Sequence, residues 1–351
     1  MISAGIVGAS GYMGGEALRV LMDHPQVEIA WATSRQSGAI EEFHPNLYGT
    51  DIKLIHPDDA TACDVVFMAL PTDVSIAVAK RFLDLDSKVI DLGSAFRLHD
   101  RATWERVYNM THPYWSMAEE AVYGISELHL NEIAQARLIA NPGCFSSAAI
   151  LGLAPAIVEG LIHTENISVS GLSGTAGIGA ELSRAAHHPE IGNNLVAYNV
   201  VGHRHSYEME QELTALTQSS VQVHFTPVYV PITRGILSIC RGFLKGPATR
   251  DDLLELYKDY YQSHPFVQIY DLPKEASASW QYKPYPWVSA IAGTNYCHVG
   301  LDVDEERNSV VILSALDSIG KGGAHAGIEN MNIMFGLDRT AGLTRRGLHP
   351  N

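Results

Sequence analysis

The chain opens with MISAGIVGASGYMGG (Met1–Gly15), and this stretch decides the fold class. Its run Ile2–Val7 is almost continuously apolar, which is typical of a buried strand in a parallel sheet. Glycines fall at positions 5, 8, 11 and 14, and GGEALRVLMDHP (residues 14–25) then places apolar residues at helical spacing until Pro25. The opening stretch therefore predicts a strand, a tight glycine turn and a helix.

The alternation of strand and helix continues to about residue 145. Short apolar runs separated by helical patterns are typical of strand–helix–strand units. Their repetition predicts a doubly wound parallel sheet of the α/β Rossmann class. The further strand runs are Val27–Ala32, Asp64–Leu70, Lys88–Leu92 and Arg137–Ala140.

After about residue 163 the strand runs are separated by less regular helices, which predicts an α+β domain with a mixed or antiparallel sheet. These runs are Ile167–Leu172, Val221–Val230, Ile236–Leu244, Val299–Val303 and Val310–Ala315. Helical patterns cover Tyr207–Leu216, Asp251–Tyr261 and Ala324–Met334. We expect the last helix to pack back on the first domain, and the polar, proline-rich segment Asp271–Pro286 to form a loop.

Composition excludes several classes of function. The 351 residues suit two domains, and 46% apolar with 18% charged residues is a globular composition. The 24 Lys and Arg face 39 Asp and Glu, a net charge of −15, and this balance argues against nucleic acid or an anionic membrane as a partner. Every apolar stretch is shorter than the roughly 20 residues of a membrane span. Four widely spaced cysteines indicate neither a structural zinc site nor a disulfide framework, so a reducing cytoplasm is expected.

The glycine turn is a candidate dinucleotide site. Glycine has no Cβ, so backbone N–H groups at a helix start can approach a pyrophosphate there. The spacing is not a strict G-x-G-x-x-G, and the turn could instead be purely structural. Ser34-Arg35 follows the second strand run with no acid before Glu41, and this pair suits a 2′-phosphate, so NADP is favoured unless Arg35 is an ordinary loop residue. The candidate residues here are Gly8, Ser10, Gly11, Tyr12, Met13, Gly14, Ser34 and Arg35.

One cysteine is a candidate nucleophile. In IANPGC (residues 139–144) a strand run ends, Pro-Gly turns the chain, and Cys144 opens an apolar helix. The positive end of a helix dipole favours the thiolate, and ligands of open α/β sheets bind at this edge. Cys63, Cys240 and Cys297 lie in or beside apolar runs and are better explained as inert core residues.

A nicotinamide cofactor and a nucleophilic thiol together predict acyl transfer through a thioester, with hydride transfer to or from an aldehyde. Such chemistry needs an acid or base, and histidine suits it near neutral pH. Gly202-His203-Arg204-His205-Ser206 provides two histidines just before a predicted helix, and His187-His188-Pro189 provides another pair. Histidine pairs also bind metals, but no nearby cysteine or acid completes an obvious metal site.

Together these segments resemble the N-acetyl-gamma-glutamyl-phosphate reductases, NADPH-dependent enzymes of arginine biosynthesis. The resemblance runs in family order from residue 8 to about residue 340. The matching segments are GASGYMGGE (8–16), HP (24–25), DLGSAFRL (91–98), YGISEL (123–128), NPGC (141–144), SGLSG (170–174), HRH (203–205), RGI (234–236), TNY (294–296), KG (321–322) and NMNIMFG (330–336).

The resemblance implies a role for each matching residue. Cys144 would be the nucleophile and His203 the acid/base group, with His205 close by. Arg97 would hold the acyl phosphate and Arg234 the substrate carboxylates. Glu127 would belong to the substrate site. Ser173 and Gly174 would belong to the cofactor site.

The resemblance also implies a Rossmann domain (residues 1–148 and 318–351) and an α+β catalytic and oligomerisation domain (149–317). That second domain would be of the glyceraldehyde-phosphate and aspartate-semialdehyde dehydrogenase type. The expected assembly is a homo-oligomer, either a dimer or a tetramer.

The chain departs from the family pattern at three places, and a related branch remains open. Ala95 stands where the family has an acid, Asp317-Ser318 where it often has D-N, and Phe145-Ser146-Ser147 where it usually has Y-P-T. Segments 187–190 (HHPE) and 347–350 (GLHP) resemble reductases of aminoadipyl phosphate carried on an amino-group carrier protein.

Two further classes of protein would contain a similar set of residues. The aspartate-semialdehyde and glyceraldehyde-phosphate dehydrogenases use the same thioester chemistry, but the H-R-H and N-M-N segments argue against both. An NADP-binding redox sensor would use Cys144 as a switch. It would need neither an acid/base histidine nor anion-binding arginines, so His203, Arg97 and Arg234 count against it.

Overall fold

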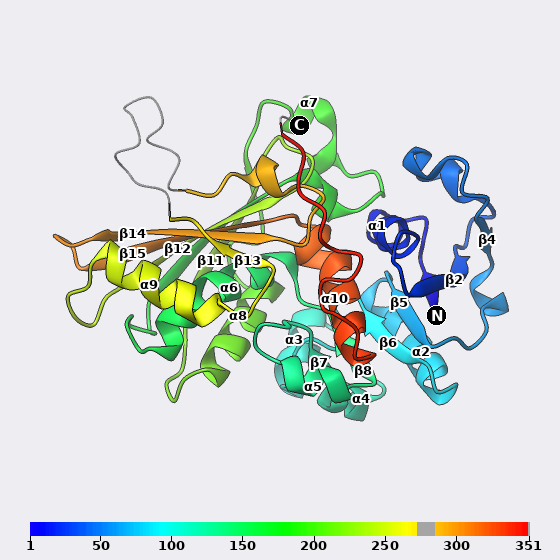
Figure 1. The fold of residues 1–351 in the computed structure, drawn as a ribbon, viewed down its shortest axis with the longest axis horizontal. Coiled ribbons are helices and arrows are strands. Elements are labelled where there is room, and N and C mark those ends of the chain that lie inside the picture. The colour runs from blue at the N-terminus through cyan, green and yellow to red at the C-terminus, as the bar shows by residue number, and fades with distance from the viewer. Residues whose placement is uncertain (272–284, 350–351) are drawn as a thin grey trace. The chain divides into compact units, whose positions relative to one another are not determined.

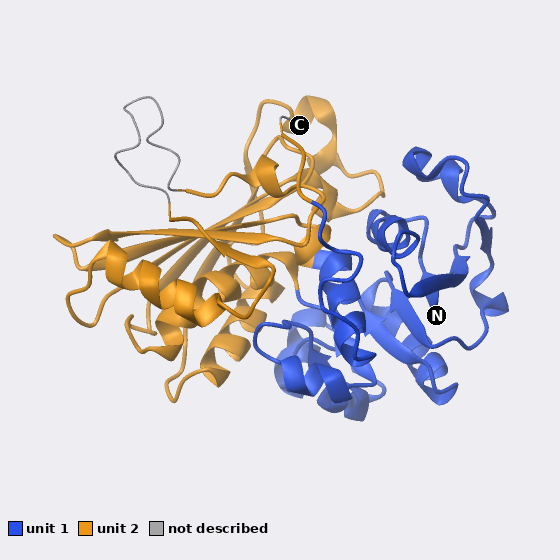
Figure 2. Ribbon diagram, viewed as in Figure 1, with its two compact units in different colours: residues 1–142, 323–345 blue, residues 143–322, 346–351 orange. Residues whose placement is uncertain are grey.

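The computed structural model describes residues 1–271 and 285–349 (Figure 1). The chain forms two units: residues 1–142 with 323–345, and residues 143–322 with the segment that begins at Arg346 (Figure 2). These boundaries lie a few residues from those expected at 148 and 318. The helix that begins at Cys144 belongs to the second unit because it packs on strands of that unit's sheet.

The first unit is built on a sheet whose described strands run in the order β3-β4-β2-β1-β5-β6-β8-β7. All neighbouring pairs are parallel except β3 with β4. The doubly wound parallel sheet expected from the sequence is confirmed. The strands are β1 (Ile2–Val7), β2 (Val27–Thr33), β3 (Gly38–Ala39), β4 (Lys53–Ile55), β5 (Val65–Met68), β6 (Lys88–Asp91), β7 (Val122–Tyr123) and β8 (Leu138–Ala140).

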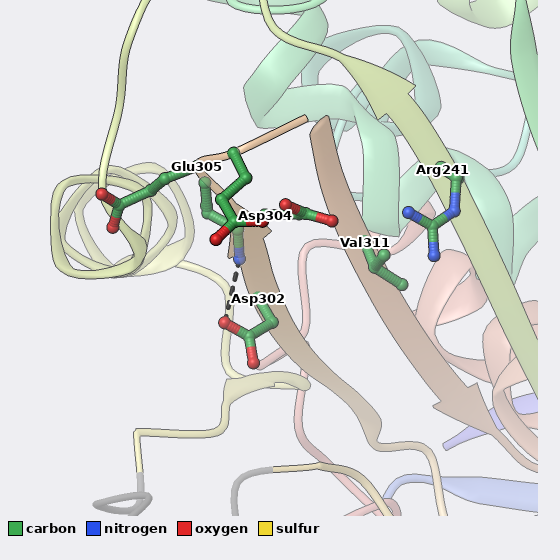
Figure 3. A pocket seen from close by; sticks show the side chains of 7 residues that line it. Arg241, Asp302, Asp304, Glu305 and Val311 are labelled. Carbon is green, nitrogen blue, oxygen red and sulfur yellow. Dashed lines mark hydrogen bonds between the residues drawn. The ribbon is translucent and has the colours of Figure 1, made fainter. Parts of the chain in front are cut away.

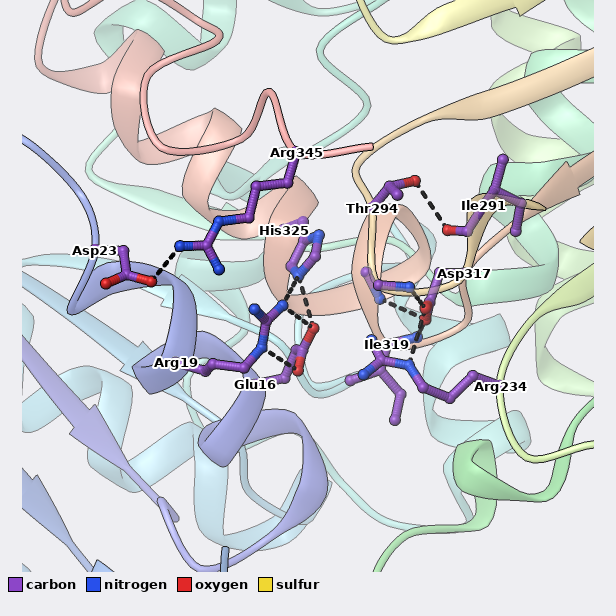
Figure 4. A network of polar contacts seen from close by, with 12 residues as sticks. Glu16, Arg19, Asp23, Arg234, Ile291, Thr294, Asp317, Ile319, His325 and Arg345 are labelled. Carbon is purple, nitrogen blue, oxygen red and sulfur yellow. Dashed lines mark hydrogen bonds and ion pairs between the residues drawn. The ribbon is translucent and has the colours of Figure 1, made fainter. Parts of the chain in front are cut away.

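The C-terminal helix of the first unit is tied to its N-terminal helix. Helix α10 (His325–Met334) packs on α1 (Tyr12–Leu21) and α5 (Leu130–Gln135). His325 Nε2 lies 2.8 Å from Oε1 of Glu16, a carboxylate that also pairs with Arg19 at 2.8 Å (Figure 4). The other helices of this unit are α2 (Thr72–Asp84), α3 (Arg101–Tyr108) and α4 (Trp115–Glu120).

The second unit is built on a mixed sheet whose described strands run in the order β10-β11-β9-β12-β15-β14-β13. The pairs β9–β11 and β13–β14 are parallel and the others antiparallel, as the α+β pattern predicts. The strands are β9 (Ile167–Ser173), β10 (Val196–Ala197), β11 (Val223–Tyr229), β12 (Ile236–Phe243), β13 (Val267–Ile269), β14 (Cys297–Asp304) and β15 (Ser309–Leu316).

Helix α6 (Cys144–Val158) is the central helix of this unit, and it is buried on all sides except at its two ends. It packs on β12 and β15, and the hydroxyl groups of Tyr257 and Tyr261 donate to its carbonyls at 2.7 and 2.6 Å. This burial fixes the position of its first residue, Cys144. The other helices are α7 (His188–Ile191), α8 (Arg204–Ala215) and α9 (Arg250–Tyr261).

The observed elements differ from the predicted ones at the start of one helix. Helix α8 begins at Arg204, three residues before the predicted start, because His203 caps it. Most of the predicted loop Asp271–Pro286 lies outside the described residues. In the part of the chain that the structure describes, no helix has the length and apolar character needed to span a bilayer.

Candidate active site

The glycine turn needs glycine at two of its positions for steric reasons. Gly8 has φ of +84°, and a Cβ there would lie 2.5 Å from the carbonyl oxygen of Ala69. A Cβ on Gly14 would lie 2.4 Å from the carbonyl oxygen of Gly8. The turn thus brings the start of α1 close against the end of β1, where the first N–H groups of a helix attract an anion.

The residues predicted to favour NADP over NAD lie beside this turn. The hydroxyl of Ser34 donates to Oγ of Ser10 at 3.0 Å and accepts from the backbone N–H of Gln36. Ser34 is buried, whereas Arg35 and Tyr12 are exposed. The first unit therefore brings Ser10, Ser34 and the glycine turn together and presents Arg35 to solvent just after β2.

Arg97 is held rigidly at the carboxyl edge of the same sheet. Its Nε donates to the carbonyl oxygen of Asn141 at 2.8 Å, and the side chain is 5% exposed. The loop that carries it is anchored by Asp91, which accepts from Ser75 Oγ and from the backbone N–H of Ala95. Burial raises the pKa of the fully buried Asp91, and Arg97 opposes that effect. Ala95, the departure in this motif, is completely buried.

Cys144 is the first residue of α6, and the residue before it is enclosed by α8. The backbone N–H of Gly143 donates to Oε2 of Glu208 at 2.9 Å. A Cβ on Gly143 would lie 2.5 Å from Nε2 of His205, and this ring nitrogen is 3.9 Å from Oε1 of Glu208. The second unit therefore brings the start of α6 and the H-R-H segment together.

The two histidines of this segment also contact one another. Their ring centroids are 4.7 Å apart, and Nδ1 of His203 accepts from the backbone N–H of His205 at 3.1 Å. The pKa of His203 is lowered to about 4, chiefly by burial and also by the positive charge of Arg204, while Glu208 acts in the opposite direction. His203 is therefore neutral at pH 7 and able to accept a proton.

The departure from the family pattern after Cys144 contributes packing around the two histidines. Phe145 packs edge-on against His203, His205 and Phe225, with ring centroids 6.2, 5.9 and 5.1 Å apart. Ser146 donates to the carbonyl oxygen of His205 at 3.4 Å. The residues that replace the usual family pattern thus support the histidines.

Arg234 is paired with an acid. Its Nε donates to Asp317 at 2.9 Å, and Asp317 is fully buried (Figure 4). Asp317 also accepts from the backbone N–H groups of Ile319 and Gly320 at 2.8 and 2.9 Å. In the pair Asp317-Ser318 only Ser318 departs from the D-N of the family pattern, and the contacts of Asp317 orient Arg234.

Ser173 and Gly174, expected at the cofactor site, lie beside this arginine. The backbone N–H of Gly174 donates to the carbonyl oxygen of Gly235 at 2.9 Å. A Cβ on Gly174 would come within 2.6 Å of the carbonyl oxygen of Thr233, so this position accepts only glycine. Both residues belong to the second unit.

Glu127 belongs to a buried polar cluster of the first unit. The hydroxyl of Ser126 lies 3.2 Å from Glu127 Oε2 and 2.7 Å from Glu329 Oε1. Arg339 lies 2.8 Å from Glu329 and 3.9 Å from Glu127. The cluster joins the YGISEL segment to helix α10.

Sequence reasoning missed one residue of this site, Glu208. Glu208 follows His205 by three residues, a spacing that puts both on one face of a helix and that was available as a signal.

Two surface hollows contain none of the residues singled out above. One, of about 450 Å³, is lined by Arg241, Asp302, Asp304, Glu305 and Val311 among others (Figure 3). The other, of about 540 Å³, lies in the first unit between Lys80 and Leu138. Among residues 1–271 and 285–349, no group of three or more His, Cys, Asp and Glu side chains is placed to hold a metal ion.

Comparison with known proteins places this geometry in a family. Residues 3–136 match the semialdehyde dehydrogenase NAD-binding domain, and residues 144–318 the semialdehyde dehydrogenase dimerisation domain. The chain is 40% identical over 356 residues to the N-acetyl-gamma-glutamyl-phosphate reductase of Pelotomaculum thermopropionicum, a match that covers 99% of both chains. The chain belongs to the N-acetyl-gamma-glutamyl-phosphate reductase family. The resemblance found in the sequence is confirmed.

The chain is also similar to other members of this family and to solved structures. The family's enzyme from Methanopyrus kandleri is 41% identical over the full length of both chains. A relative from Cenarchaeum symbiosum, 39% identical over 99% of this chain and all of its own, is provisionally named a LysW-linked 2-aminoadipate or glutamate phosphate reductase. Aspartate semialdehyde dehydrogenase II of Vibrio cholerae has a TM-score of 0.70 at 16% identity, over 95% of this chain and 98% of its own. This last likeness shows the expected fold.

Proposed function

We propose that this chain reduces N-acetyl-gamma-glutamyl phosphate to N-acetylglutamate semialdehyde and phosphate, with NADPH as the reductant. The observation that carries the proposal is the meeting of Gly143-Cys144 with His203, His205 and Glu208 at the start of a buried helix. Family membership at about 40% identity over the full length supports the substrate.

In the proposed reaction the Cys144 thiolate attacks the acyl carbon, and phosphate leaves with the bonding electrons, which forms a thioester. NADPH, held by the glycine turn and Ser34-Arg35, would supply the hydride that reduces this thioester. The aldehyde would then leave and the Cys144 thiolate would be regenerated. His203 accepts the thiol proton at the start of the cycle. A thiol used in this way requires a reducing compartment, which supports a cytoplasmic location.

The first unit supplies groups that fit a dinucleotide. The closely packed glycine turn at the start of α1 suits the pyrophosphate, and the pair Ser34-Arg35 suits a 2′-phosphate. A solved structure of similar fold, the aspartate semialdehyde dehydrogenase of Candida albicans, is described with NADP. We therefore propose NADP rather than NAD as the cofactor.

Arg35→Ala is expected to remove most of the preference for NADPH over NADH. One charged hydrogen-bonded contact to a phosphate contributes roughly 1.5–3 kcal/mol, so NADPH affinity should fall by about tenfold or more while NADH affinity changes little. Titration of both cofactors by fluorescence measures the effect. Arg101→Ala, at an exposed arginine of α3, is the control. Equal affinity of the unmodified protein for both cofactors would contradict the proposal.

Arg97 and Arg234 are proposed to hold the charged ends of the substrate, the acyl phosphate and the carboxylate respectively. Each guanidinium is oriented by a neighbour, the Asn141 carbonyl for Arg97 and Asp317 for Arg234. His205 and Glu127 are proposed to complete the substrate site. Both side chains are buried, His205 beside Glu208 and Glu127 beside Ser126, and these contacts fix their positions.

We also propose that the chain forms a homo-oligomer through the second unit, which matches a dimerisation domain. Helices α6, α8 and α9 contact its sheet (Figure 1). On β12 and β15, side chains that alternate with the buried ones remain partly exposed and apolar. They are Leu237, Ile239, Val311 and Leu313.

The carrier-linked reaction is the second candidate, because one relative of this chain is named for LysW-linked substrates. The test supplies the purified protein with NADP, phosphate and N-acetylglutamate semialdehyde, and follows NADPH formation. Aminoadipate semialdehyde on its carrier protein is assayed in parallel. Activity with the free substrate is expected. Activity only with the carrier-linked one would establish the second candidate, and activity with neither would overturn both.

A further inference from the structure

A buried histidine contacts the glycine turn from a later segment of the first unit. Nε2 of His44 lies 2.8 Å from the carbonyl oxygen of Ala9, the residue between Gly8 and Ser10. A carbonyl oxygen can only accept a hydrogen bond, so this ring nitrogen carries a proton and donates it. The side chain of His44 is 8% exposed. The ring therefore fixes one peptide group of the turn.

The chain around His44 holds its ring against helix α1. The backbone N–H of His44 donates to the carbonyl oxygen of Ile40 at 2.9 Å, and its own carbonyl oxygen accepts from the N–H of Leu47 at 2.9 Å. The ring lies against Gly15 of α1, where a Cβ would come within 2.3 Å of both Cε1 and Nε2. The absence of a side chain at Gly15 therefore makes room for the ring.

Ala9 is held from both sides. Its N–H donates to the carbonyl oxygen of Thr33, at the end of β2, at 2.9 Å, and its own carbonyl accepts from His44. The C=O and N–H of a trans peptide group point in opposite directions. The contact between His44 and Ala9 therefore turns the N–H of Ser10 away from the ring. Among the described residues, no atom accepts a hydrogen bond from this N–H.

The N–H of Ser10 lies just before the start of α1. Gly11 is the N-cap of this helix and has no side chain that could cap the N–H groups of the first turn. Free N–H groups at such a place bind phosphate oxygens. The side chain of Ser10 is fixed as well, because its hydroxyl accepts from Ser34 at 3.0 Å. The turn therefore presents an oriented amide to an anion.

We propose that His44 is a positioning residue for the dinucleotide, because its hold on the Ala9 carbonyl keeps the N–H of Ser10 in the orientation that binds the pyrophosphate. This inference rests on the proposed cofactor site. The pyrophosphate is common to NADPH and NADH, whereas Arg35 is proposed to contact only the 2′-phosphate. Loss of the His44 hydrogen bond should therefore weaken both cofactors by the same factor.

The test measures the affinity of the full-length protein for each cofactor and needs no turnover. NADPH and NADH are titrated separately by fluorescence. His44→Leu removes the donor, so both Kd values should rise by about threefold to tenfold, the effect of one lost hydrogen bond. His44→Gln restores an N–H donor, so its Kd values should stay within about twofold of those of the unmodified protein. His56→Leu, at an exposed histidine of the same unit, is the control.

Gly15→Ala disturbs the same contact from the other side. Its Cβ displaces the ring of His44 from the Ala9 carbonyl, so both Kd values should rise as they do in His44→Leu. Urea unfolding of each variant shows whether it is folded. If His44→Leu does not fold, Gly15→Ala decides the question.

Three outcomes would overturn the inference. Unchanged Kd values in His44→Leu and Gly15→Ala would show that the contact has no effect on the cofactor. An equal rise in His44→Leu and His44→Gln would show that the ring acts by packing alone. A rise confined to NADPH would show that His44 acts at the 2′-phosphate. An unmodified protein that binds neither cofactor would instead defeat the proposed cofactor site itself, so the two failures are distinguishable.

Discussion

Cys144→Ser is expected to abolish turnover while the protein still binds NADPH. A serine hydroxyl is far less acidic than a thiol, so neither the nucleophile nor the thioester forms. The glycine turn belongs to the other unit and is untouched. Steady-state assays measure the loss, and cofactor titration confirms that the protein remains folded. Steady turnover by this variant would show that the nucleophile is misassigned.

The other three cysteines provide matched controls. Burial raises the pKa of Cys63 to about 11 and that of Cys240 to about 12, so neither forms a thiolate at neutral pH. Cys297 is fully buried at the start of β14. Replacement of each by alanine should cost stability but leave turnover largely intact. Mixing with acyl phosphate without NADPH should give one acyl adduct, on the peptide that carries Cys144, and an adduct elsewhere would contradict the assignment.

His203→Asn is expected to lower kcat by roughly 10² to 10⁴, the usual contribution of a positioned acid or base. Asparagine retains a polar group of similar size at the N-cap of α8, where the ring accepts from the backbone N–H of His205, so the fold should survive. His205→Asn is the comparison. A larger loss in that variant than in His203→Asn would transfer the acid/base role to His205.

The pKa of His203 adds a second readout. Because burial lowers it to about 4, the neutral base should persist well below the ordinary 6.5, and kcat/KM should decline on the acid side only near pH 4–5. The free energy of unfolding should also fall as the pH falls. Between pH 6.5 and about 4 the unfolded chain binds a proton that folded His203 does not, so stability is lost as pH falls. Urea unfolding should show a smaller loss in His203→Asn.

Local sequence pattern was enough to locate the elements that position the candidate site residues. The apolar runs of β1, β2, β5 and β6 differ from the observed strands by no more than two residues at either end. Pro-Gly followed by a cysteine and an apolar run correctly predicted a helix beginning at Cys144. Strands β3, β7 and β10 have two residues each, too few to show a period, so they could not be predicted.

Contacts between residues that are distant in the sequence could not be predicted from local pattern. Glu208 contacts Gly143 across 65 positions of sequence, and Arg234 pairs with Asp317 across 83. Neither distance leaves a local pattern. The predicted start of α8 lies too late because histidine is an uncommon cap, and only the folded chain shows that the ring of His203 acts as one.

The sequence by itself determined the fold class, the glycine turn, the candidate nucleophile and the family, because each depends on residues that are neighbours in the chain or on motifs of a few residues. Only the tertiary structure decided what surrounds them. Packing of α8 against the start of α6 helps to bury His203 and keep it neutral, and it encloses Gly143 between His205 and Glu208. Burial and electrostatics depend on distances in space, and the folded chain alone sets those distances.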